Sequence, residues 1–454
     1  MKLYKFILPI FAVLAIASCE SYTEDLNDDP NAFVVASSDL IIGQVQLALM
    51  QHMGSNNARY AAVFSNQMSG GDRQYLTLNT YSPNRGNYND MWNDTYIAGI
   101  NNAQLIINDD SASDLIRGIA EILQGTMFAD MALLYGDVPF SEAVQPNEFP
   151  EPAYDLQKKV VEEGIKLIES GIIKVGPATI AAGYGGARLE GGTWAEAAHT
   201  LAARYALAVD DKDKAIDHAT KGITSRANDL VTQQGNAQYN RNLMYQFVID
   251  QRQDYLVATD SHLANLLDVN NTDKTRALTT PGDELIFASY FLRDGTYGDP
   301  SYRTLVNTNN GGRYAATASM PIATYYENEL ILAEAKLGSD DSGARGHLNN
   351  VRTVLAAQYG SNATGFPASS STGAALKKEV LEEKYITLIG ELVAYHDLRR
   401  TRNFIAVPNK LNPASILPNG FPQRFLYPQN EVDTNIENIP SPLPTFFETT
   451  TLFN

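Results

Sequence analysis

The chain has 454 residues and a formal net charge of −18, from 34 Lys and Arg against 52 Asp and Glu. With 44% hydrophobic and 19% charged residues, the composition suits globular domains and excludes a disordered chain, collagen or a coiled coil as a description of the whole protein. The negative charge argues against a nucleic-acid surface, because phosphate binding needs clustered Lys and Arg.

The N-terminal residues have the features of a secretion signal. Lys2 and Lys5 precede an apolar run over residues 6–17, which is too short to cross a bilayer as a helix. The run ends in Ile16-Ala17-Ser18-Cys19, which resembles a bacterial lipobox and contains the only cysteine of the sequence. We therefore expect cleavage after residue 18 and acyl chains on Cys19 that anchor the protein in a membrane. An ordinary signal peptide with an incidental cysteine is the alternative.

A polar segment follows the cysteine. Residues 20–38 contain Asn27-Asp28-Asp29-Pro30-Asn31 and few apolar side chains, which favours an extended, solvated tether. No later stretch approaches about eighteen consecutive apolar residues, so we expect no transmembrane helix. The expected organisation is a signal peptide over residues 1–18, a lipid-anchored tether over residues 19–38 and a single domain over residues 39–454.

Helical spacing dominates the body of the chain. Apolar residues recur at this spacing from Leu115 to Leu134, and Gly136 is placed to end that helix. Thr193-Trp194-Ala195-Glu196 has the pattern of a capping box and opens a second helix that runs to Val209. Its partner is expected from Asp213 to Arg226, after a short turn.

A third helix pair is expected further along the chain. It runs from Pro321, at a first helical position, to Gly338 and continues from Asp341 to Leu355. A last helix is expected from Leu376 to His396. Because short links join paired amphipathic helices, we predict an all-α fold built of antiparallel helix pairs, in the manner of tetratricopeptide repeats.

Long polar stretches separate the predicted helices. Loops of this length in a compact domain are usually functional or disordered, and ligand contacts concentrate on loops held by a rigid scaffold. The stretches cover residues 65–90, 176–192, 294–313, 359–373 and 408–438.

No catalytic motif is present in the sequence. HExxH, Walker A, GxSxG and dinucleotide-binding patterns are all absent. The six histidines never fall three or four residues apart, which favours helix-surface or capping roles over a metal site. A carboxylate pair for glycoside hydrolysis cannot be chosen among 52 acids. We therefore predict no enzyme activity, no metal and no cofactor.

Tyrosines in two polar stretches are the remaining functional candidates. A sugar ring has apolar C–H faces and a hydroxyl rim, so it suits flat aromatic rings flanked by polar side chains. The alternative is that half of these rings pack under their own loops. For Trp92 and Trp194, which lie in helical contexts, burial in the core is the favoured interpretation. The tyrosines are Tyr75, Tyr81 and Tyr88 in the first stretch, and Tyr297 and Tyr302 in residues 294–314.

Five short motifs occur in order along the chain. They are Asp25-Leu26-Asn27-Asp28-Asp29-Pro30-Asn31, the segment from Ala129 to Phe140, the segment from Tyr326 to Ala335, the helix from Glu382 to Arg400, and Arg424-Phe425-Leu426-Tyr427-Pro428 with Glu431 and Asn435. Together with the lipobox they resemble the motifs of the SusD/RagB-like nutrient-binding outer-membrane lipoproteins. The resemblance covers nearly the whole chain.

This resemblance implies both a fold and a role. The fold would be a SusD-like all-α body on four tetratricopeptide-like helix pairs, held at the cell surface by the lipid on Cys19. The role would be non-catalytic: the protein would capture oligosaccharides, or peptides in some members, as a lid over a TonB-dependent SusC-like transporter in the outer membrane. The motifs belong to the scaffold and carry no ligand identity.

We expect a shallow binding surface formed by residues 65–90 and 294–314. A peptide ligand would make Arg303 and Arg313 the primary contacts, because charged chain ends need counter-charges. A surface glycoside hydrolase on an α/α scaffold and an adhesin without a transporter are alternatives from other classes. For an oligosaccharide, the stacking residues would be Tyr75, Tyr81, Tyr88, Tyr297 and Tyr302, and the rim residues Asn66, Asp72, Arg303 and Arg313.

Overall fold

The computed structural model describes residues 36–180, 188–274, 276–362, 364–411 and 420–454. Helices dominate from Ser38 to Asn454, which form one compact unit, and the strands are only two to four residues long. In this described part, no helix has both the length and the apolar composition needed to cross a bilayer. The predicted signal peptide, most of the predicted tether and Cys19 lie outside the described residues.

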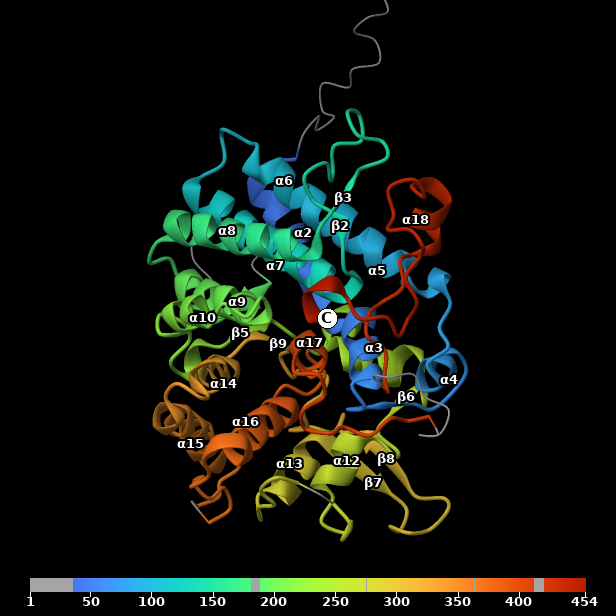
Figure 1. Ribbon diagram of the computed structural model, residues 1–454, viewed down its shortest axis with the longest axis vertical. Helices are drawn as coiled ribbons and strands as arrows, with labels where there is room; N and C mark the ends of the chain where they lie inside the picture. Colours follow the sequence, from blue (N-terminus) through green and yellow to red (C-terminus); the bar gives the residue numbers. More distant parts are fainter. Residues whose placement is uncertain (1–35, 181–187, 275, 363, 412–419) are drawn as a thin grey trace, which may run out of the picture. The chain divides into compact units, whose positions relative to one another are not determined.

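Four pairs of helices that are adjacent in sequence pack against each other. They are α7 (Asp114–Tyr135) with α8 (Gln157–Val175), α9 (Trp194–Ala208) with α10 (Lys212–Ala219), α14 (Tyr325–Lys336) with α15 (Asp341–Gln358), and α16 (Gly373–Thr387) with α17 (Leu392–Arg400). Neighbouring pairs touch through α8 and α9, α10 and α14, and α14 and α16, as Figure 1 shows. The predicted all-α fold is confirmed, whereas the tetratricopeptide-like geometry of the pairs stays a prediction.

Glycines let α7 and α8 approach closely. A Cβ atom at Gly164 of α8 would lie 2.7 Å from the carbonyl oxygen of Gly125 of α7. A Cβ atom at Gly171 would lie 2.5 Å from the carbonyl oxygen of Gly118. Because both neighbours are backbone atoms, any side chain at these positions would force the two helices apart.

Two predicted helix ends are confirmed. Gly136 ends α7 with a φ of 97°, a backbone conformation that favours glycine. At the start of α9, Thr193 Oγ1 accepts a hydrogen bond from the N–H of Glu196 at 3.2 Å. Glu196 Oε2 accepts one from the N–H of Thr193 at 3.3 Å, which completes the capping box.

Two other predicted boundaries are wrong. α10 ends at Ala219 and not at Arg226, and the Asn328 side chain of α14 donates to the free Ala219 carbonyl at this end at 2.9 Å. Pro321 does not begin a helix, since Pro321–Ala323 form strand β9, which pairs with β5 (Leu230–Thr232). α14 begins four residues after Pro321, with Thr324 as its N-cap.

The helix expected from Leu376 to His396 is interrupted. Residues 388–391 separate α16 from α17, and Gly390 has a φ of 73° there. Such a φ breaks the helical path, and Glu391 then takes an extended conformation as the N-cap of α17. The periodic apolar pattern continues across this break, which is why the sequence favours one helix.

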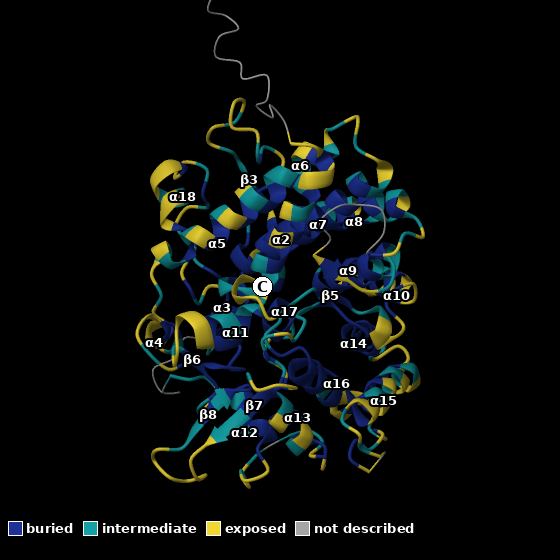
Figure 2. Ribbon diagram, turned by 180° about the vertical axis from the view of Figure 1, so that it is seen from behind, coloured by how far each residue is buried: buried dark blue, intermediate teal, exposed yellow. Residues whose placement is uncertain are grey.

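Shorter elements complete the fold, and most large apolar side chains lie inside it (Figure 2). Trp92 and Trp194 are 4% and 0% exposed, which confirms their assignment to the core. The helical elements before α7 are α2 (Ser38–Gly54), α3 (Asn56–Phe64), α4 (Gln74–Asn79), η1 (Arg85–Tyr88), α5 (Asn89–Asn93), η2 (Asp94–Asn101) and α6 (Asn102–Ile107). Those after α10 are η3 (Arg226–Asn228), η4 (Gln238–Asn240), α11 (Leu243–Tyr245), η5 (Gln246–Gln251), α12 (His262–Leu267), α13 (Asp283–Tyr290), α18 (Gln429–Thr434) and η7 (Thr451–Phe453).

Short antiparallel strand pairs join segments that are distant in sequence. β1 (Ser69–Gly70) pairs with β6 (Leu256–Val257), so that the polar stretch after α3 lies beside the segment that leads into α12. β7 (Phe291–Asp294) and β8 (Arg303–Val306) form a hairpin with an exposed tip. The remaining strands are β2 (Val138–Pro139), β3 (Tyr154–Asp155) and β4 (Leu189–Glu190).

Candidate functional site

A cavity of about 560 Å³ lies where four segments meet. Its lining comes from residues 66–79, residues 257–265, Arg303 of β8 and residues 408–410. The pairing of β1 with β6 brings the first two segments together. We call it the junction cavity.

Asn66 fixes the geometry of the junction cavity. It lies just after α3 with a φ of 57°, and 4% of it is exposed. Its side chain donates to the carbonyl of Pro408 at 2.9 Å and accepts from the N–H of His262 at 3.1 Å. One side chain therefore ties three of the four segments together.

Lys410 ties residues 408–410 to the segment of residues 66–79. Its Nζ donates to the carbonyl of Met68 at 2.5 Å and to Asn79 Oδ1 at 2.9 Å. Asn79 Oδ1 also accepts from the N–H of Gly70 at 3.1 Å, where a Cβ atom would overlap the carbonyl oxygen of Tyr75. Burial lowers the pKa of the Lys410 ammonium to about 7.

Three polar side chains of the lining have hydrogen-bonding capacity left over. Within the described residues, the His262 ring, the Asn265 amide and the Asp260 carboxylate form no hydrogen bond. Burial lowers the pKa of His262 to about 4, so its ring is neutral at neutral pH and offers one donor and one acceptor. The amide adds donors and an acceptor, and the carboxylate adds acceptors.

The structure corrects the expectation for three of the predicted stacking tyrosines. Tyr75, Tyr81 and Tyr88 are 1%, 5% and 0% exposed and pack against other aromatic rings. Tyr75 Oη accepts from Arg59 Nε at 3.1 Å, so even its polar end is occupied. These rings lie under their own segment, and no sugar ring can stack on them.

The two tyrosines of the β7–β8 hairpin lie near the surface but outside the cavity lining. Tyr297 is 40% exposed, and its ring centroid lies 5.4 Å from that of Tyr302 in an edge-to-face arrangement. Tyr302 Oη donates to Asp268 Oδ2 at 3.1 Å. Arg303, which follows Tyr302, does line the cavity and donates to Asp254 Oδ1 at 2.5 Å.

The predicted rim residues are divided between separate places. Asn66 and Arg303 both line the junction cavity. Asp72 is exposed beside it, outside the lining. Arg313 lies elsewhere: it pairs with Glu391 at 3.3 Å and lines a smaller cavity of about 180 Å³. A site containing all four residues is therefore not formed.

Four residues of the junction cavity were not expected from the sequence. Asn79, His262, Asn265 and Lys410 come from segments far apart in the chain, and no motif marks any of them. The only signals are that Asn79 falls in the polar stretch over residues 65–90 and Lys410 in the stretch over residues 408–438.

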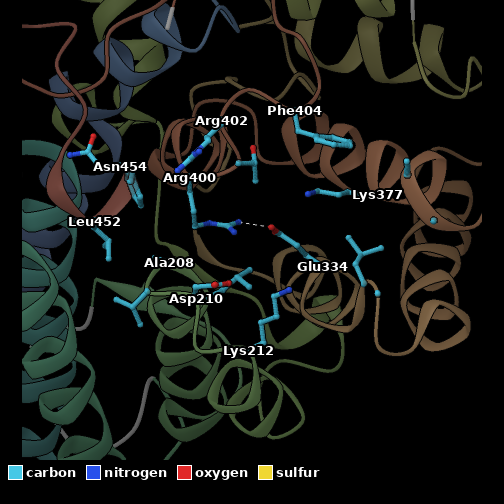
Figure 3. A pocket seen from close by; sticks show the side chains of 18 of the residues that line it. Ala208, Asp210, Lys212, Glu334, Lys377, Arg400, Arg402, Phe404, Leu452 and Asn454 are labelled. Carbon is cyan, nitrogen blue, oxygen red and sulfur yellow. Dashed lines mark hydrogen bonds and ion pairs between the residues drawn. The ribbon is translucent and has the colours of Figure 1, made fainter. Parts of the chain in front are cut away.

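A second cavity, of about 540 Å³, lies at the ends of the helix pairs (Figure 3). We call it the helix-end cavity. Many of its charged groups already pair with each other: Arg400 donates to Glu334 at 2.7 Å, and Asp341 accepts the backbone N–H groups of Gly338 and Gly373. Lys377 lies 4.4 Å from the centre of the Phe404 ring. Within the described residues, the side chains of Asp210, Lys212 and Arg402 in the same lining form no hydrogen bond or ion pair, so the unused groups of this cavity are mainly charged ones.

The histidines do not form a metal site in the part of the chain that the structure describes. His52 and His396 are each 3% exposed, which corrects the expectation that they lie on helix surfaces. Their Nε2 atoms each lie 3.5 Å from a different carboxylate oxygen of the buried Asp130.

A family model described as SusD-like, "starch-binding associating with outer membrane", matches residues 30–428. The chain belongs to the SusD-like family. The members are described as carbohydrate-binding proteins associated with the outer membrane, and they are not enzymes. The predicted family and the predicted lack of enzyme activity are confirmed by this membership.

Solved structures with the SusD-like fold are similar to this chain. A chitin-binding SusD homologue from Flavobacterium johnsoniae shares 15% identity at a TM-score of 0.69, over 91% of this chain and 98% of that one. A SusD homologue from Bacteroides uniformis has the same identity and TM-score, over 91% and 99%. A SusD/RagB family protein from Bacteroides thetaiotaomicron shares 20% identity at a TM-score of 0.63, over 89% and 95%. No curated protein sequence matches this chain.

Proposed function

We propose that this protein is a cell-surface lipoprotein that captures oligosaccharides in the junction cavity and delivers them to a TonB-dependent SusC-like transporter. The observation that carries the proposal is the set of unused hydrogen-bonding groups on Asp260, His262 and Asn265, which face one cavity. The lipid on Cys19 would hold the protein at the outer membrane.

The chemistry of this lining suits a ligand rich in hydroxyl groups. A hydroxyl both donates and accepts, as do a neutral imidazole and an amide, while a carboxylate accepts from two neighbouring hydroxyls. The described lining contains no Phe, Tyr or Trp, so recognition would rest on hydrogen bonds.

Affinity is expected to be modest. Hydrogen bonds exchanged with water contribute about 0.5–1.5 kcal/mol each, so several of them together are needed for a dissociation constant in about the millimolar to micromolar range. Weak capture suits release to a transporter. The chitin-binding relative supports carbohydrate as the ligand class.

Isothermal titration calorimetry with oligosaccharides selected on a glycan array tests this proposal. Replacing two unused groups together, His262→Leu with Asn265→Ala, should weaken binding by about tenfold or more. Lys377→Ala in the helix-end cavity is the matched control and should leave the affinity unchanged. Unchanged binding by the double variant, or loss only in the control, would remove the junction cavity as the site.

Delivery has its own test. The protein should co-purify with a large outer-membrane transporter when membranes are solubilised gently. Consistent purification without such a partner, while glycan binding is retained, would contradict delivery and favour an adhesin.

A further inference from the structure

Lys410 brings a positive charge into the junction cavity without a carboxylate partner. The acceptors of its Nζ are a backbone carbonyl, the Asn79 amide oxygen and the Ser69 hydroxyl, all of which are neutral. No acid of the described residues lies within ion-pair distance of Lys410, and residues 412–419 contain no Asp or Glu. Burial alone accounts for its lowered pKa, since no charged neighbour offsets it.

A lysine held in this way leaves part of its hydrogen-bonding capacity available. Two contacts, at 2.5 and 2.9 Å, are strong, whereas the third, to Ser69 Oγ, is 3.4 Å long. An ammonium has three N–H donors, so one of them can turn to a stronger acceptor. Ser69 also lines the cavity, and its hydroxyl could donate to that same acceptor.

The other charges of the lining do not cancel this one. Arg303 is paired with Asp254, and Asp260 is the single acid among the described lining residues. Asp260 is exposed, whereas Lys410 is partly buried, and a charge is expensive to bury without an opposite charge. The cavity thus has an amine that no carboxylate of the described residues pairs with, in a chain whose net charge is −18, and a bound anionic group would favour its charged form.

We propose that the junction cavity selects oligosaccharides that carry an acidic group, a carboxylate or a sulfate, which pairs with Lys410. This inference rests on the proposed oligosaccharide-binding function. The side chains of Asp260, His262 and Asn265 bind the hydroxyls, and Lys410 supplies the preference for a charged ligand. Charge-assisted hydrogen bonds are roughly twice as strong as neutral ones, which makes the preference measurable.

A glycan array that displays neutral, uronate-containing and sulfated oligosaccharides tests this selectivity. The glycans bound should be predominantly acidic. For a uronate-containing ligand, the matched probe is the same oligosaccharide with its carboxylates reduced to alcohols, and for a sulfated ligand it is the desulfated form. Calorimetry should show about ten- to hundredfold weaker binding of the neutral probe, because a hydrogen bond to a charged group contributes about 1.5–3 kcal/mol.

Variants separate the charge of Lys410 from its structural role. Lys410→Met should reduce affinity for the acidic ligand to that for its neutral probe, whereas Lys410→Arg should keep the preference. Asn79→Ala removes one anchor of Lys410 and keeps its charge, so it should retain the preference even if overall affinity falls. Equal losses for both ligands in Lys410→Met would show a structural role only and would overturn the proposal.

The outcomes also separate this inference from the proposed function. Binding of neutral glycans with no gain from an acidic group would overturn the selectivity and leave oligosaccharide capture intact. Binding of no glycan in any class would overturn the proposed function itself. An acidic ligand should in addition bind more weakly at high salt, because a paired surface-accessible charge is screened.

Discussion

Asp130 shows how single residues make this fold depend on pH. Burial would raise the pKa of its carboxyl, but the rings of His396 and His52, whose Nε2 atoms each lie 3.5 Å from it, lower the pKa below the usual range. Burial lowers the pKa of His396 to about 4, and its Nδ1 is 2.7 Å from Arg399 Nη2. The cluster is therefore most stable with Asp130 ionised and His396 neutral.

The pH dependence of stability follows from the histidine. In the unfolded chain, His396 takes up a proton near pH 6.5, whereas in the folded protein it does so only near pH 4. Between these values the unfolded state binds more protons, so stability falls as pH decreases through this window. The full shift corresponds to about 3 kcal/mol, an upper bound for this one group.

Urea denaturation at a series of pH values measures this effect. His396→Gln should flatten the loss of stability between pH 6.5 and pH 4, even if the variant is less stable at pH 7. If the free energy of unfolding fell equally steeply with decreasing pH in the variant and in the natural protein, His396 would not be the source of the pH dependence. His262 has a similarly lowered pKa and lies in the junction cavity, so His262→Gln is a useful second variant.

At the scale of helices, the glycine contacts between α7 and α8 set how closely the helix pairs pack. Gly164 has the carbonyl of Gly125 against the position of its missing side chain, whereas a Cβ atom at Gly346 of α15 would meet nothing within 4 Å. Gly164→Ala should therefore destabilise the protein by about 1–3 kcal/mol through overpacking.

Gly346→Ala is the matched control for this prediction. It should raise the free energy of unfolding by about 0.5–1 kcal/mol, because alanine lowers the conformational entropy of the unfolded chain and its Cβ atom meets no clash in α15. Thermal or urea denaturation of both variants checks the pair. Equal changes in the free energy of unfolding of the two variants would contradict close packing at Gly164.

Helical elements were predictable where the chemistry is local. The capping box at Thr193 and the glycine at the end of α7 act through neighbouring residues, so their effects can be inferred from sequence. The break before α17 was not predictable, because Leu388 and Ile389 continue the apolar pattern up to Gly390. Pro321 was misassigned because its role depends on β5, a strand about ninety residues earlier.

At the scale of the whole molecule, the site depends on tertiary contacts. The junction cavity combines segments near residues 66, 260, 303 and 410, which only the fold brings together. A polar stretch that contains tyrosines does not reveal whether its rings face solvent or fold back on the core, and Tyr75 and Tyr88 pack on Tyr60. Asn66 and Arg303 could be proposed from the sequence as polar residues of a binding site. The residues that line the cavity beside them, such as His262 and Lys410, could not.

The most direct test of oligosaccharide capture in the junction cavity is amide hydrogen exchange with and without a bound oligosaccharide. Binding should protect residues 66–79 and 257–265 and leave the helix-end cavity unchanged. Protection at the ends of α9, α14 and α16 instead, or no protection near Asn66 and His262 at a saturating ligand concentration, would contradict capture at this site.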